Sequence, residues 1–129
     1  MITLDTLTTR TGRTFDDHLD RTLTIPVLAG MQAQGDLIVI PGGAQPAGEW
    51  EQVPAEGTVL LDGVHPHVLF AEPGTCRVQA HPADLALIEA TAPVYLMHPE
   101  HGATGLAPGV YVARRQREWR ESAFQDVCD

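Results

Sequence analysis

The sequence predicts an all-β fold, a small sandwich or barrel of seven or eight short strands with little helix. Turn signals containing glycine or proline recur at short intervals after Gly57, which is typical of all-β domains. The segments between these turns are short apolar runs, and no long amphipathic period follows Gly30. This pattern favours two packed sheets or a closed barrel over a parallel α/β sheet.

The composition limits the classes of partner. A chain of 129 residues has the common size of one domain. Its net charge is −9, and all eight basic residues are arginine, so we expect neither a nucleic-acid partner nor a membrane partner. The two cysteines, Cys76 and Cys128, lack metal-type spacing and are expected as free thiols. The N-terminus shows no secretory signal, which predicts a soluble cytoplasmic protein.

Residues 1–30 are predicted to be an extension that packs on the body or on a partner, and residues 31–129 to be a single all-β domain. Thr14 is the expected N-cap of a helical turn with acids at its start. Residues 21–28 favour a strand interrupted by Pro26, which would place that strand at a sheet edge. A chain beginning near Met31 is therefore expected to fold cooperatively.

The strands of the body follow in order. The β-branched run at residues 36–41, bounded by glycines, predicts a buried strand, and residues 43–57 predict an ordered loop. The further expected strands are 58–61, 64–71, 75–80, 85–90, 94–98 and 110–119, with turns at 62–63, 73–74, 81–82, 91–93, 101–102 and 108–109. Residues 122–129 are expected to form a last helical turn, with Phe124 and Val127 docked on the body.

Four of the six histidines form two pairs, His65 with His67 and His98 with His101. A His-x-His pair in a strand places both imidazoles on one face. Two such ligands, met by one or two more from another segment, suit a divalent transition metal such as zinc, iron, nickel or manganese. We therefore predict all four as metal ligands. The alternative is that the histidines are structural and pair with acids or carbonyls across the sheet.

The sequence does not determine which way the histidine cluster faces or what chemistry it performs. Alternation places His65, His67 and Leu69 on one face of their strand and Val68 and Phe70 on the other. If the aliphatic face packs on the sheet core, the histidines face the other way, towards a ligand cavity or towards solvent. Glu100, between the second pair, is a candidate acceptor for an imidazole or a general base, or else a solvated turn acid. The sequence assigns no reaction.

The C-terminal segment holds half of the positive charge. Arg114, Arg115, Arg117 and Arg120 lie beside Trp119, and basic residues next to an aromatic residue can bind single-stranded nucleic acid. The net negative charge opposes that interpretation, as does alternation, which divides the arginines between two faces. We expect a solvated, partly ion-paired strand, which could instead receive an acidic protein.

The first histidine pair resembles the first cupin motif, in which a glycine precedes a His-x-His and a glutamate follows. Here Gly57, His65, His67 and Glu72 match it. The resemblance implies a double-stranded β-helix of jelly-roll type that binds iron, manganese, nickel or zinc, with His98 or His101 as the fourth ligand. Strict alternation places Glu72 on the opposite face from the histidines unless a β-bulge intervenes.

A second resemblance extends over residues 34–119. The segments Gln34-Gly35-Asp36-Leu37, Gly63–His67, His98–His101, Leu106–Tyr111 and Arg114–Trp119 are similar, in this order, to those of a family of small uncharacterised bacterial and phage proteins. The resemblance implies a shared fold and a shared histidine site. The competing class is a non-catalytic interaction or structural subunit, and in either case we expect a protein partner or a homo-oligomer.

Overall fold

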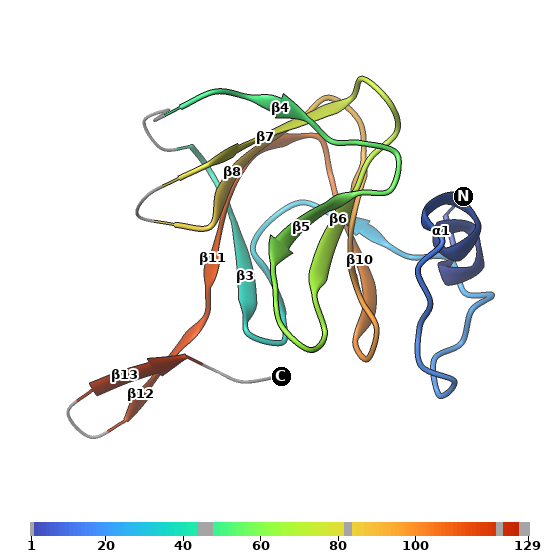
Figure 1. Cartoon of the computed structure of the whole chain (residues 1–129), viewed down its shortest axis with the longest axis horizontal. Helices are drawn as coiled ribbons and strands as arrows, with labels where there is room; N and C mark the ends of the chain where they lie inside the picture. The colour runs from blue at the N-terminus through green and yellow to red at the C-terminus, as the bar shows by residue number, and fades with distance from the viewer. Residues whose placement is uncertain (1, 44–47, 82–83, 121–122, 127–129) are drawn as a thin grey trace.

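Two facing β-sheets form the body of the protein, and a short helix packs on one of them (Figure 1). The computed structural model describes residues 2–43, 48–81, 84–120 and 123–126, with side chains as far as residue 116. The sandwich-like, mostly β architecture confirms the predicted fold class. No helix in these described ranges has the length and apolar character needed to span a membrane.

The first sheet has five strands in the order β1 (Val27–Leu28), β10 (Gly102–Leu106), β9 (Val94–His98), β6 (His67–Phe70) and β5 (Thr58–Leu61). The second has six strands in the order β2 (Gln32–Gln34), β3 (Leu37–Pro41), β11 (Gly109–Arg115), β8 (Ala86–Ala90), β7 (Cys76–Ala80) and β4 (Glu51–Gln52). Strands β12 (Arg117–Arg120) and β13 (Ala123–Asp126) pair separately. All these pairs are antiparallel except β1 with β10.

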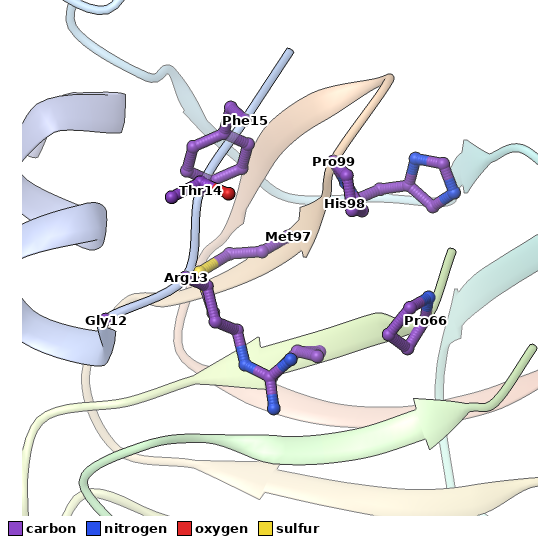
Figure 2. A pocket seen from close by; sticks show the side chains of 9 residues that line it. Gly12, Arg13, Thr14, Phe15, Pro66, Met97, His98 and Pro99 are labelled. Carbon is purple, nitrogen blue, oxygen red and sulfur yellow. The ribbon is translucent and has the colours of Figure 1, made fainter. Parts of the chain in front are cut away.

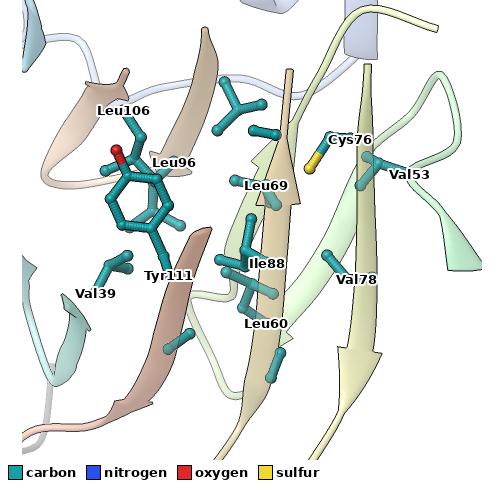
Figure 3. Packing of buried hydrophobic residues seen from close by; sticks show 14 of the residues in the cluster. Val39, Val53, Leu60, Leu69, Cys76, Val78, Ile88, Leu96, Leu106 and Tyr111 are labelled. Carbon is teal, nitrogen blue, oxygen red and sulfur yellow. The ribbon is translucent and has the colours of Figure 1, made fainter. Parts of the chain in front are cut away.

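The main core lies between the two sheets (Figure 3). Leu69 and Leu96 are paired neighbours in the first sheet and face Ile88 from the second, and all three are fully buried. Burial of side chains of this size contributes about 1.5–3 kcal/mol each. Cys76 lies in the same cluster, where burial raises the pKa of its thiol to about 11. It is a structural, unreactive thiol.

A second apolar cluster lies on the outer face of the five-stranded sheet. Val68, Phe70, Tyr95 and Met97 point away from the main core and pack against Leu4, Leu7, Phe15 and Ile25 of the N-terminal segment. These contacts join the N-terminal segment to the five-stranded sheet and bury the outward-facing side chains of β6 and β9.

The N-terminal helix lies earlier in the chain than the helical turn that the sequence predicted. Helix α1 (Leu4–Thr11) begins at the N-cap Thr3, whose side chain forms a capping box with Thr6, and it ends at Gly12, which has a φ of 75°. The helical turn expected at Thr14 is wrong. The capping hydrogen bonds come from Thr3 and Thr6, a Thr-x-x-Thr pattern earlier in the chain. Phe15 is not in a helix, and its side chain is buried in the second cluster.

Two further expectations about strands fail. Residues 102–106 form β10, where only a turn at 101–102 was expected. Strand β10 pairs with β1 only because residue 105 is a glycine. A Cβ at this position would lie 2.6 Å from the carbonyl oxygen of Pro26 and would exclude β1 from the sheet edge. Residues 123–126 form β13, not a helical turn, and Val127 lies outside the described residues. The edge position predicted from Pro26 is correct for β1.

Candidate functional site

The four histidines singled out by the sequence meet at one end of the sandwich. Strands β6 and β9 are antiparallel neighbours, and the pairing of Val68 with Met97 places His67 beside His98. The ring centroids of these two residues are 4.5 Å apart. The ring of His98 lies 4.4 Å from that of His101 and 5.8 Å from that of His65. Two segments thirty residues apart in the sequence thus form one cluster.

Two of the histidines are buried on the inner face of the sheet. His67 is 1% exposed and His98 is 0% exposed. They share that face with Leu69 and Leu96, which belong to the core between the sheets. The inner pair therefore faces the protein interior, at the end where the turn between β2 and β3 approaches β6 (Figure 1).

The β2–β3 turn supplies two polar residues that the sequence analysis did not assign to the site. Gly35 takes a φ of 57°, and the turn brings Gln34 and Asp36 to the ring of His67. The amide nitrogen of Gln34 donates to the carbonyl oxygen of Leu96 at 2.9 Å. Its oxygen therefore faces Nδ1 of His67, at 2.9 Å. Because that oxygen can only accept, Nδ1 of His67 carries a proton.

Asp36 links the histidine to an arginine. Its Oδ1 lies 3.1 Å from Nε2 of His67, and its Oδ2 lies 3.6 Å from a guanidinium nitrogen of Arg115. The Asp36 side chain is 12% exposed. A buried charge of this kind is stable only when it is paired. His67 and Arg115 provide that pairing from two different sheets.

His98 has the opposite hydrogen-bond pattern from His67. Its Nδ1 accepts the backbone N–H groups of Glu100 at 3.1 Å and His101 at 3.2 Å. A ring nitrogen that accepts has no proton, so the neutral ring of His98 carries its hydrogen on Nε2. These two bonds fold residues 98–101 into the turn that returns His101 to the cluster.

The outer part of the cluster is half exposed. Nε2 of His65 lies 2.6 Å from Oε1 of Glu100, and the two side chains are 37% and 40% exposed. Glu100 is thus a partner of an imidazole, one of the roles that the sequence left open. An exposed pair of this kind contributes little to stability and separates at low cost.

Glu72 is engaged elsewhere. Both of its carboxylate oxygens accept from the guanidinium of Arg10 in α1, at 2.8 and 2.7 Å. The Arg10 guanidinium holds the pKa of Glu72 below its ordinary value. This pair fastens the helix to the end of β6, and Glu72 takes no part in the histidine interactions described here, unlike the glutamate of the cupin motif.

The arginines of the C-terminal strand are ion-paired where their side chains are described. Arg114 binds Asp84 at 3.0 Å, and Arg115 lies next to Asp36. The side chains of Arg117, Trp119 and Arg120 lie outside the described part of the chain. The described pairs fit the expected ion-paired strand.

As the side chains stand, the cluster is a hydrogen-bonded network. Among the side chains that the structure describes, no three from histidine, cysteine, aspartate and glutamate form a group that could hold a metal ion. The carboxylate nearest to each of His65 and His67 faces Nε2, the atom through which that ring would bind a metal. Metal binding would require an ion to enter between these paired atoms.

Gln34, Asp36 and Arg115 had one signal in the sequence. Each lies in a segment that carries the second resemblance, at opposite ends of the similar region, but nothing in the residue types indicated that these segments meet at His67. These segments meet because β3 and β11 are paired, with Arg115 opposite Leu37, the residue that follows Asp36.

A comparison with known families gives a match. Residues 33–116, more than half of the chain, match the model of a family described as a domain of unknown function (DUF8820). The chain belongs to this family. The matched range contains every residue of the histidine cluster and its Gln34, Asp36 and Arg115 partners. Searches of curated proteins and of solved structures gave no match.

Proposed function

We propose that this member of the DUF8820 family binds a divalent transition metal ion at the histidine cluster, with His65, His67 and His101 as nitrogen ligands and Asp36 as an oxygen ligand. The observation that carries the proposal is the convergence of four imidazoles and two carboxylates at one end of the sandwich. Zinc, iron, nickel and manganese all accept this combination of donors.

His67 is the ligand that the surrounding residues prepare best. The Gln34 oxygen accepts the proton on Nδ1, so the neutral form of the ring has its lone pair on Nε2, the atom that lies beside Asp36. Metal-binding histidines commonly have an acceptor of this kind on their other nitrogen. Two donors on one tetrahedral ion with bonds of about 2.1 Å lie roughly 3.4 Å apart, close to the 3.1 Å between Nε2 and Oδ1.

His98 receives a different role in this proposal. Its Nδ1 accepts two backbone N–H groups, and Nε2 would have to lose its proton before it could bind an ion. We therefore propose that His98 holds the 98–101 turn in place and donates a hydrogen bond from Nε2, although the sequence suggested it as a ligand. Glu100 releases His65 when the ion binds.

A titration of the untagged, metal-free chain with zinc and nickel tests this assignment. We expect saturation near one ion per chain, abolished in the His65→Ala/His67→Ala double variant. The His18→Ala/His81→Ala double variant is the matched control, because it removes the same number of imidazoles outside the cluster. His98→Asn keeps a side-chain acceptor for the turn, so it should keep uptake. If the cluster double variant binds as the parent does, the proposal fails.

A second candidate function is a non-catalytic interaction subunit in the cytoplasm, and one observation favours it. Leu23, Val27, Leu28 and Met31 are exposed by 64%, 38%, 52% and 65% within nine residues of chain, beside the edge strands β1 and β2. Exposed apolar stretches of this kind are typical of protein interfaces. Sedimentation velocity of the parent and of Leu28→Glu would test for self-association, and a monomer in both cases would contradict a homo-oligomer.

A further inference from the structure

We propose that a pocket between the N-terminal segment and strands β6 and β9 binds a small apolar carboxylate through Arg13. The pocket has a volume of about 260 Å³, and its lining includes His98 of the histidine cluster (Figure 2). Its walls include Arg13, Phe15, Pro66, Val68, Met97 and Pro99. The volume is just below the range of about 300–1,000 Å³ for drug-sized ligands, so the ligand is a compact one.

The Arg13 guanidinium has no ion-pair partner among the described residues. Its side chain extends from the 12–15 segment into the pocket (Figure 2). Its Nε is buried and has no hydrogen-bond partner among the described residues. A buried N–H group without an acceptor costs free energy, so a ligand that placed an acceptor at this Nε would recover that cost on binding.

The other described arginines show that this situation is unusual. The side chains of Arg10, Arg21, Arg77, Arg114 and Arg115 each pair with a carboxylate. The chain has seventeen acidic residues and eight basic ones, yet none of the described acids pairs with Arg13. A carboxylate supplied by a ligand would accept hydrogen bonds from the Arg13 guanidinium in the bidentate geometry that these two groups form.

The walls and the overall charge define the rest of the ligand. Phe15, Val68 and Met97 belong to the second apolar cluster, and two prolines complete an apolar surface that favours an aromatic ring or a branched aliphatic group. A single arginine balances one negative charge. A phosphate dianion would keep an excess charge against the protein's net charge of −9. A monocarboxylic acid such as phenylacetate fits both limits.

The pocket is separate from the proposed metal ligands, although His98 forms part of its wall. Binding of the acid therefore does not depend on an ion in the cluster. It can be measured in metal-free buffer, where a failure of the metal proposal would leave the result unchanged.

Titration of phenylacetate followed by methionine methyl NMR tests the proposal. Met97 lies in the pocket wall, while the exposed Met31 serves as an internal control in the same spectrum. We expect a saturable shift of the Met97 signal, assigned with Met97→Leu. Arg13→Gln should weaken binding by roughly tenfold or more, because a charge-assisted hydrogen bond is lost. Arg77→Gln, which removes the same charge on the other sheet, should bind as the parent does.

Three results would overturn the proposal, provided that thermal melts show folded protein. They are a shift that never saturates, an Arg13→Gln variant that binds within about twofold of the parent, and equal affinity for phenylacetate and neutral phenylacetamide. Tighter binding of inorganic phosphate than of phenylacetate would overturn the carboxylate assignment in particular.

Discussion

Strands β6 and β9 have two faces that are buried by different parts of the chain. The inner face carries Leu69 and Leu96 into the core between the sheets and ends in His67 and His98. The outer face is buried under the N-terminal segment. Strands buried on both faces read as nearly continuous apolar runs, so burial alone does not distinguish the faces. The histidines belong to the face that the second sheet encloses, where Gln34 and Asp36 lie close enough to contact His67.

The largest effect is expected from removing the cover of the outer face. A chain beginning at Met31 lacks Leu4, Leu7, Phe15 and Ile25, and their loss uncovers the side chains beneath them. At about 1.5–3 kcal/mol for each buried side chain, the loss is of the same order as the whole stability of a typical domain. We therefore expect no cooperative thermal transition by circular dichroism, although the sequence favoured a chain that still folds. A cooperative melt close to that of the full chain would show that the outer layer is dispensable.

Single substitutions compare the two faces more sharply. Leu69 and Leu7 are both fully buried, one between the sheets and one under the helix. We expect Leu69→Ala to lower the free energy of unfolding by about 3–5 kcal/mol and Leu7→Ala by about 2–3 kcal/mol. The helix can move inward to fill its cavity, whereas the two sheets cannot. Urea denaturation measures both values, and a larger loss for Leu7→Ala would reverse this ranking.

A smaller effect is expected where the N-terminal segment joins the sheet. Gly105→Ala would bring a Cβ to 2.6 Å from the Pro26 oxygen and 3.0 Å from the Val27 Cα. Both atoms belong to the backbone, so we expect β1 to be displaced at a cost of about 1–3 kcal/mol. Gly48→Ala is the control, because a Cβ there would have no atom of the described residues within 4 Å apart from its chain neighbours. Equal melting temperatures for the two variants would mean that β1 contributes nothing to stability.

The smallest effect concerns the ion pair that fastens α1. Arg10 lowers the pKa of Glu72 below its ordinary value, so the pair stabilises the folded state above the unfolded pKa. This stabilisation is lost as the pH falls through the lower, folded pKa. Glu72→Gln should therefore melt slightly below the parent at neutral pH and together with it in strong acid. The difference should be small because the pair is exposed, and a difference that grew on acidification would contradict the assignment.

The sequence predicted the elements that depend on local pattern. Strands 58–61 and 94–98 were located to the residue, because each is an apolar run bounded by turn residues. Strand β10 was missed because its residues are small and have no apolar period, and its pairing depends on the absence of a side chain at Gly105. That reason lies in a contact with a segment almost eighty residues away.

The candidate site was likewise predictable from the sequence only in part. The meeting of the four histidines was predictable, because the spacing of each pair suggested a shared site. The parts played by Gln34, Asp36 and Arg115 depend on which strands pair and on which face each residue lies, and these are tertiary properties. The hydrogen bonds of His98 were equally hidden, since they come from backbone groups of its own turn.

The metal content of the purified protein shows directly whether the histidine cluster binds an ion. The untagged chain, prepared without chelator, should contain about one zinc, iron, nickel or manganese ion per molecule by elemental analysis, and the His65→Ala/His67→Ala variant prepared in parallel should contain almost none. If the parent carries no such ion and takes up none on incubation with these metals, the histidines form a structural network only. The account of this cluster as a metal site would then be wrong.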